Sequence, residues 1–207
     1  MAKVFIDIQN ADCCFPDAKL TNWLVDGQGK IRLADTKSFL FTQDGTFSKA
    51  IPGNENVYTL HTPGFEPSEI INPSFNAEKL HSSLLGRNIY AYLTGGWPNV
   101  INPNLPIFET DLGKEYKTLI TNLIKDPPEK RMSLSAAYST LQELALRSLF
   151  IEKISELNQS AGVVTTDLKL NERFEDTLLL IQQISSIEIN SQSSVSQKKY
   201  MILSVMQ

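Results

Sequence analysis

The segment at 76–93, NAEKLHSSLLGRNIYAYL, constrains the fold more than any other part of this chain, because its pattern predicts a buried helix. Apolar residues recur along it at three- and four-residue steps, the spacing that places side chains on related helix faces: Leu80, Leu84, Leu85, Ile89 and Leu93. Gly95-Gly96 follows directly and predicts the end of the helix. We therefore expect a mainly helical fold with this helix in its core.

Further helices are expected on the C-terminal side. Residues 112–126 carry one apolar stripe and run into a pair of prolines, and Ser133 can cap a helix from about 134 to 158. Residues 171–187 predict another helix, and the serine-rich stretch 190–197 predicts a flexible linker. These elements predict a helical extension beyond the main domain.

A small hairpin is predicted near the N-terminus. The short strands NWLVD and KIRLAD flank Asp26-Gly27-Gln28-Gly29, which is a strong signal for a tight turn. The apolar residues 3–9 fit either the end of a helix or a short strand. Residues 36–64 have no sustained period and are rich in Gly, Pro, Asn and Thr, so they predict a long loop that is functional or disordered.

Composition limits the range of partners. The 207 residues suit one domain with or without an appendage, and a net charge of -4 argues against nucleic acid as the main partner. No apolar run approaches the ~18 residues of a membrane span, and the N-terminus does not resemble a secretory signal. Cys13 and Cys14 are adjacent and rarely bridge in that arrangement, which favours a reducing compartment. We expect a cytoplasmic protein, and delivery into another cell's cytosol stays open.

The residues around the hairpin suit phosphoryl transfer. Asp17, Lys19 and Asn22 lie within six positions before it, and Asp35 follows it. Such chemistry needs a carboxylate to accept a proton, a cation to neutralise charge, and oxygen ligands for Mg²⁺. The alternative is that the first three form a polar turn before a hairpin and that Asp35 caps a strand end.

These residues and three later motifs resemble the C-terminal lobe of the eukaryotic-type Ser/Thr protein kinase family. The stretch DAKLTN matches the catalytic pattern D-x-K-x-x-N, and Asp35 matches the Asp of the D-F-G motif. The segment HTPGFEPSE is similar to the end of an activation segment. Residues 79–98 and 123–137 resemble the central lobe helix and the late D-P-x-x-R motif. The similarity covers roughly residues 8–147, in the order of the family.

The resemblance implies a role for each matched residue. Asp17 would be the catalytic base and Lys19 the charge-neutralising cation. Asn22 and Asp35 would bind the cofactor, ATP with Mg²⁺, as metal ligands. Thr62 would bond both Asp17 and Lys19 from the activation segment.

The resemblance also implies a structural ion pair between Glu69 and Arg131. Such a pair is buried in the lobe, where breaking it costs about 3–5 kcal/mol.

The chain also departs from the family pattern. No Gly-rich loop and no strand lysine of the nucleotide-covering N-terminal lobe are present, and Phe15-Pro16 stands where His-Arg is usual. Thr36-Lys37 replaces the Phe-Gly of the D-F-G motif. His81 occupies the place of a helix Asp that anchors the catalytic loop, where a neutral imidazole can still accept one bond.

We therefore expect a kinase-like C-lobe over 1–149 with a small β-hairpin at its active site, followed by a helical extension over 150–207. The first functional hypothesis is ATP-dependent transfer to Ser/Thr hydroxyls of a protein substrate, with an N-lobe supplied from elsewhere, for instance by another chain. The second is a catalytically inactive pseudokinase that binds a protein partner as a scaffold. Neither nucleic acid nor a membrane is an expected partner.

Overall fold

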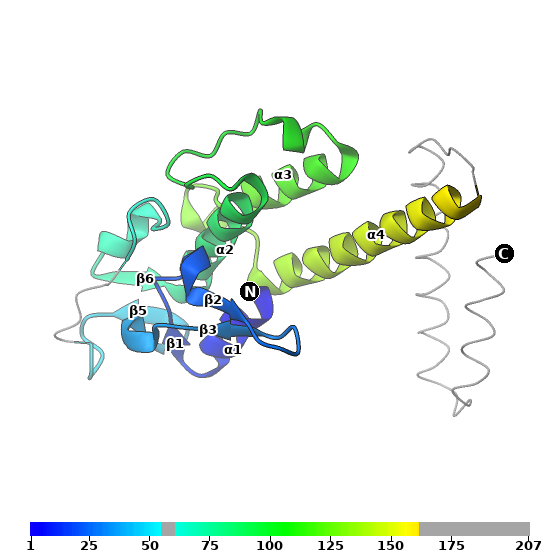
Figure 1. Ribbon diagram of the computed structural model, residues 1–207. Helices are drawn as coiled ribbons and strands as arrows, with labels where there is room; N and C mark the ends of the chain where they lie inside the picture. Colours follow the sequence, from blue (N-terminus) through cyan, green and yellow to red (C-terminus); the bar gives the residue numbers. More distant parts are fainter. Residues whose placement is uncertain (55–60, 162–207) are drawn as a thin grey trace, which may run out of the picture. The chain divides into compact units, whose positions relative to one another are not determined.

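The computed structural model describes residues 1–54 and 61–161, and the chain divides into two units, Met1–Leu144 and Ala145–Gln207 (Figure 1). The boundary expected at 149–150 falls inside helix α4 (Leu134–Ala161), which begins in the first unit and continues into the second. The helix expected at 171–187 and the linker at 190–197 lie outside the described residues. Among the described helices, none combines the length and apolar character that crossing a membrane requires.

The described part of the chain combines helices with small antiparallel sheets, which is roughly consistent with the mainly helical fold expected, although the sequence predicted only one hairpin and not the four-stranded sheet. Besides α4, its α-helices are α1 (Ala2–Asn10), α2 (Ala77–Thr94) and α3 (Asp111–Leu123). Short 3-10 turns connect the larger elements: η1 (Leu20–Asn22), η2 (Thr36–Ser38), η3 (Ser68–Ile71), η4 (Pro106–Phe108) and η5 (Pro128–Lys130). The helix α1 settles the ambiguity that the sequence left at 3–9.

Helix α2 is the buried helix that the sequence predicted, and its ends follow from its caps. The Asn76 side chain accepts a hydrogen bond from the Lys79 amide at 3.0 Å, and Gly95 ends the helix in the left-handed region at φ 65°. Gly86 faces α3, where a Cβ atom would lie only 2.9 Å from the Leu123 Cβ. Glycine at this position therefore allows α2 and α3 to pack closely.

Two small sheets lie on the N-terminal side of α2. Strands β2 (Trp23–Val25) and β3 (Ile31–Leu33) form the predicted hairpin, in which Asp26 Oδ1 accepts from the Gln28 and Lys30 amides at 2.9 Å each. The other sheet has the order β1-β4-β5-β6 and is antiparallel throughout. Its strands are β1 (Cys13–Cys14), β4 (Leu40–Gln43), β5 (Thr46–Ser48) and β6 (Ser74–Asn76).

The expectation of a long loop without regular structure over 36–64 is wrong for residues 40–48. Strands β4 and β5 form a hairpin there, and Phe47 stacks on Phe75 of β6 with ring centroids 4.6 Å apart. Asn54 is 1% exposed and holds this hairpin through bonds to both the N–H and the C=O of Phe41, at 3.1 and 2.9 Å. Its amide also donates to the Ser48 carbonyl at 3.0 Å. Long-range pairing, which no local period reveals, orders this segment.

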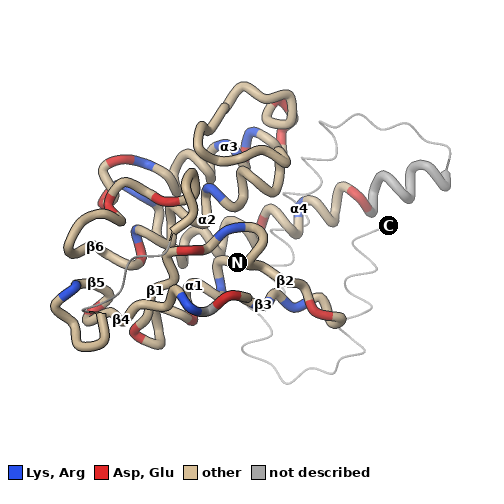
Figure 2. The backbone as a smooth tube through the Cα atoms, turned by 60° about the vertical axis from the view of Figure 1, so that its left-hand side comes forward, with Lys and Arg blue, Asp and Glu red and all other residues tan. Residues whose placement is uncertain are grey.

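Charged residues of both signs are interspersed along the described chain (Figure 2). Helix α3 shows the same mixture, with Asp111, Lys114, Glu115 and Lys117 on consecutive turns. No described helix therefore carries charge of only one sign at its surface over several turns.

Candidate functional site

Three side chains from two distant segments meet at one point. The Thr62 hydroxyl donates to Asp17 Oδ1 at 2.6 Å and accepts from Lys19 Nζ at 3.0 Å. Lys19 Nζ also lies 3.4 Å from Asp17 Oδ2. The Asp17 side chain is 10% exposed, so its carboxylate keeps only a narrow access to solvent. The two contacts that the resemblance implied for Thr62 are both present.

The loop that carries Asp17 and Lys19 is held by its own polar groups. The Asn22 amide donates to the Asp17 carbonyl at 2.8 Å, and the Asn22 N–H donates to the Lys19 carbonyl at 2.9 Å. These bonds close the loop into the 3-10 turn η1, directly before strand β2. The spacing D-x-K-x-x-N therefore produces a compact turn with Asp17 and Lys19 on the same side as Thr62.

Helix α2 anchors the same loop from behind. His81 is 0% exposed, its Nε2 accepts from the Phe15 N–H at 2.9 Å, and its ring stacks on Phe5 with centroids 4.6 Å apart. Burial lowers the pKa of His81 to about 3, so the ring stays neutral and keeps its acceptor nitrogen. This is the single bond that the comparison with the family pattern had left open to a neutral imidazole at this position.

Asn88, two turns further along α2, is a second anchor that sequence reasoning missed. Its amide nitrogen donates to the Ala18 carbonyl at 2.8 Å, and its oxygen accepts from the Trp23 indole at 3.2 Å. The residue is 0% exposed. A polar residue among the apolar positions of a buried helix was the one available signal, because a buried amide needs partners.

The two candidate metal ligands sit at the open end of the β2-β3 hairpin. Trp23 pairs with Leu33, and the Ala34 N–H donates to the Asn22 carbonyl at 2.8 Å, so the chain returns beside Asn22 just before Asp35. Asp35 adopts the left-handed conformation at φ 55° and ψ 59°, and its carboxylate lies 3.7 Å from Lys37 Nζ. Asn22 Oδ1 takes no hydrogen bond from any residue in the described ranges. The hairpin thus places an amide oxygen and a carboxylate on adjacent backbone positions.

The predicted ion pair between Glu69 and Arg131 is present and buried. Arg131 Nη2 lies 3.0 Å from Glu69 Oε2, and Nη1 contacts Glu69 Oε1, which makes the pair bidentate. The Arg131 and Glu69 side chains are 1% and 7% exposed. The same guanidinium donates to the carbonyls of Lys125 and Lys79 at 2.8 and 2.9 Å, so it joins four segments of the lobe.

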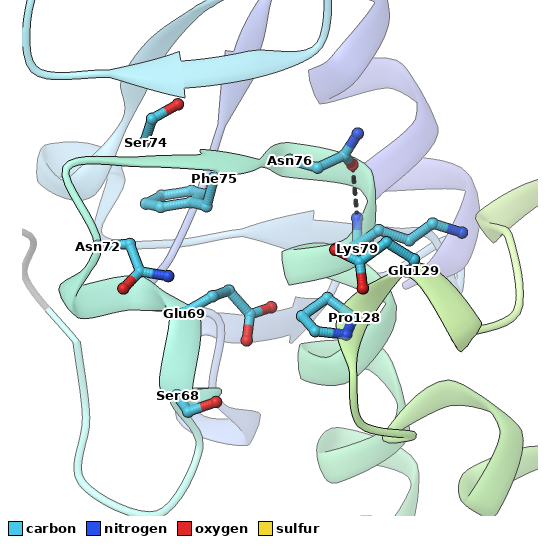
Figure 3. A pocket seen from close by; sticks show the side chains of 9 residues that line it. All are labelled: Ser68, Glu69, Asn72, Ser74, Phe75, Asn76, Lys79, Pro128 and Glu129. Atoms are coloured by element: carbon cyan, nitrogen blue, oxygen red, sulfur yellow. Dashed lines mark hydrogen bonds between the residues drawn. The ribbon is translucent and has the colours of Figure 1, made fainter.

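A pocket of about 520 Å³ is lined in part by Glu69 of this ion pair (Figure 3), and its lining includes no residue of the Asp17 cluster. Its walls come from η3, β6, the start of α2 and η5: Ser68, Glu69, Asn72, Ser74, Phe75, Asn76, Lys79, Pro128 and Glu129. Glu69 is paired with Arg131, and Lys79 Nζ donates to the Arg131 carbonyl at 2.9 Å. Because these two charged groups are engaged by the fold, the pocket offers less chemistry than the Asp17 cluster.

Trp97, in the loop after α2, contacts the segment that carries Thr62. Its indole donates to the Pro63 carbonyl at 2.9 Å and meets Phe65 edge-on with centroids 5.1 Å apart. Cys14 is buried, with its thiol pKa raised to about 12 by burial, so it stays a protonated core residue. Cys13 is partly buried and its thiol pKa is also raised, chiefly by burial, which disfavours a reactive thiolate.

No protein-family model matches this chain, and no curated protein matches it either. The assignment of a function therefore depends on the geometry of the site.

Proposed function

We propose that residues 1–144 form a protein-kinase-like C-terminal lobe that transfers the γ-phosphoryl group of ATP to Ser or Thr hydroxyls of a protein. The observation that carries the proposal is the contact of Thr62 with both Asp17 and Lys19, across more than forty residues of sequence. A chance polar turn before a hairpin gives no reason for a distant threonine to bond both groups. The buried Glu69–Arg131 pair supports the same lobe architecture.

Each residue of the cluster has a distinct task in this proposal. Asp17 accepts the proton of the substrate hydroxyl as its oxygen attacks phosphorus, and Lys19 neutralises charge on the transferred group. Thr62 fixes the orientation of both side chains, because it bonds one as donor and the other as acceptor. Asn22 bonds the Asp17 carbonyl and so couples the metal-binding side of the loop to the catalytic carboxylate.

Asn22 and Asp35 would hold Mg²⁺, and their chemistry fits that ion. Both present oxygen ligands, which hard cations prefer, and Mg²⁺ usually takes only one or two protein ligands besides water and phosphate oxygens. Bound there, the ion would supply positive charge to the phosphates of ATP. We propose these two residues as the metal ligands because the β2-β3 pairing brings Ala34 beside Asn22 and so returns the chain there just before Asp35.

A nucleotide-covering lobe from elsewhere completes the proposed enzyme. The β2-β3 hairpin, whose open end carries the candidate metal ligands, exposes three apolar side chains: Leu24 at 53%, Val25 at 70% and Ile31 at 38%. Exposed apolar side chains at a hairpin beside the site suit contact with another folded part. They equally favour the second function, a pseudokinase that binds a protein partner through this surface.

The test measures phosphoryl transfer from ATP to Ser/Thr-containing protein, with the full chain alone and with a nucleotide-binding small lobe added. We expect weak Mg-ATP binding by the chain alone and transfer when the lobe is present. Asp17→Asn should lower the transfer rate at least ~100-fold, the typical contribution of a general base. Asp44→Asn, which alters an exposed turn of the β4-β5 hairpin, is the matched control and should leave the rate unchanged. Transfer that is absent, or that Asp17→Asn leaves intact, would favour the scaffold function instead.

A further inference from the structure

We infer that Asn88 is a positioning residue that sets the backbone between Asp17 and Lys19, an inference that rests on the proposed function. Asn88 belongs to α2 and lies 70 residues from Ala18, whose carbonyl its amide bonds at 2.8 Å. That carbonyl belongs to the peptide unit that joins Ala18 to Lys19, one residue after Asp17. The bond therefore restrains the backbone from which both side chains of the cluster extend.

The orientation of the Asn88 amide is fixed by three partners. Its nitrogen donates to the Ala18 and Leu84 carbonyls, both at 2.8 Å, and its oxygen accepts from Trp23 Nε1 at 3.2 Å. A flipped amide would set its oxygen against two carbonyls and its nitrogen against an indole N–H. Only one orientation of the amide is compatible with these neighbours, so the amide group is a rigid support.

The neighbouring peptide units are restrained as well. The Asp17 carbonyl accepts from the Asn22 side chain at 2.8 Å, and the Phe15 N–H donates to His81 at 2.9 Å. With Asn88 on Ala18, the backbone on both sides of Asp17 has a fixed hydrogen-bond partner. Loss of the Asn88 bond would leave the following peptide unit free to rotate, and Lys19 with it.

Small shifts at this place have large kinetic consequences. Asp17 and Lys19 meet at one hydroxyl, with contacts of 2.6 and 3.0 Å to Thr62, so the cluster tolerates little displacement. A misplacement of ~1 Å in a catalytic group can cost ~100-fold in rate. We therefore expect Asn88 to affect the rate of transfer without touching substrate.

The test compares Asn88→Leu with Ser82→Ala. Leucine keeps the approximate volume of the side chain and removes all its hydrogen bonds. Ser82 is a matched control, because it is also 0% exposed on α2 and bonds the Glu78 and Met132 carbonyls at 2.9 Å, away from the loop. Stability in urea is measured for both variants, so that a general loss of folding is seen directly.

Two readouts separate positioning from stability. The first is the ¹³C resonance of the Ala18 carbonyl, which should move in Asn88→Leu and stay in Ser82→Ala. The second is phosphoryl transfer with the small lobe present, where Asn88→Leu should lower kcat at least tenfold with KM for the substrate nearly unchanged. If Asn88→Leu does not fold, Trp23→Phe removes the bond to the Asn88 oxygen together with part of the buried ring that packs on Phe5, and it should shift the Ala18 signal and lower kcat by a smaller factor.

The outcomes separate a failure of the proposed function from a failure of the role of Asn88. If the wild-type chain shows no phosphoryl transfer that depends on Asp17, the proposed function is wrong, and the positioning role that rests on it is wrong too. If the wild-type chain transfers phosphate but Asn88→Leu matches Ser82→Ala in kcat and in the Ala18 signal, only the positioning role is wrong. The positioning role is also defeated if Asn88→Leu is unfolded and Trp23→Phe behaves as wild type in both readouts.

Discussion

Replacing Arg131 by methionine should strongly destabilise the first unit, because this one side chain joins several of its segments. The guanidinium is 1% exposed and binds the Glu69 carboxylate at two points. It also donates to the Lys125 and Lys79 carbonyls and lies 3.1 Å from the exposed Asp126 carboxylate. Methionine retains much of the stem and leaves Glu69 as a buried charge without its cation. The expected cost is about 3–5 kcal/mol, a large part of the ~5–15 kcal/mol that stabilises a typical domain.

Replacing Glu69 instead should lower the free energy of unfolding by a smaller amount. Glu69→Gln leaves Arg131 with both carbonyls and with Asp126, whose side chain is 72% exposed and can follow the guanidinium. The loss is then closer to one charged hydrogen bond, about 1.5–3 kcal/mol. Lys114→Met is the control, because Lys114 and Asp111 are 60% and 58% exposed at 3.3 Å, and an exposed pair contributes only ~0–1 kcal/mol.

The assay is urea unfolding followed by circular dichroism, with the double variant Glu69→Gln/Arg131→Met included. Removing both charges should cost less than the sum of the single changes by at least ~1 kcal/mol, since neither charge is left buried alone. A cost below ~1 kcal/mol for Arg131→Met, or strict additivity in the double variant, would refute the view that this pair joins the lobe.

Three further changes give separate tests. His81 has a pKa of about 3 in the folded protein, whereas a histidine of the unfolded chain protonates near pH 6.5. The free energy of unfolding should therefore fall by about 1.4 kcal/mol for each pH unit below 6.5, down to about pH 3. Urea titrations at several pH values should show a smaller slope for His81→Asn. Gly64 has a φ of 92°, and in Gly64→Ala the new Cβ would lie 2.4 Å from the Trp97 indole nitrogen. The substitution should therefore lower the free energy of unfolding by about 1–3 kcal/mol and shift the Trp97 fluorescence. An unchanged spectrum would contradict the packing described. Asn54→Ala should speed hydrogen exchange of the Phe41 amide at least tenfold, against no change at the α2 amides, and equal protection in the variant would show that the hairpin does not depend on Asn54.

Local pattern was sufficient for helices α2, α3 and the start of α4 and for the first hairpin, while it left α1 undecided. The apolar steps and Gly95 gave α2 to within a residue at each end, and the Asp26 turn gave the β2-β3 pair. Helix α3, found at Asp111–Leu123, was expected at 112–126, and the proline pair limited the error at its end. Each of these signals acts between residues a few positions apart.

Other parts of the fold depend on contacts between residues far apart in the sequence, which a local pattern does not predict. Strand β5 is ordered by β6, where Phe47 lies opposite Phe75 across a separation of 28 residues. Asn54 and Asn88 act on backbone groups, which every residue possesses, so their partners leave no trace in the sequence. The contacts of Thr62 and of Arg131 were predicted only through the resemblance, because motif order carries long-range information that spacing alone lacks.

The two anchors on α2 also fix a relation between lengths. His81 and Asn88 are seven residues apart, which is about 10 Å along a helix, and they hold Phe15 and Ala18, which are three residues apart around a turn at residues 16–17. Both bonds form at the same time, so a single inserted or deleted residue in either stretch would leave one of the two anchoring side chains without its hydrogen-bond partner. Insertions and deletions should therefore be tolerated in the turn at 26–29 long before they are tolerated between 15 and 18 or between 81 and 88.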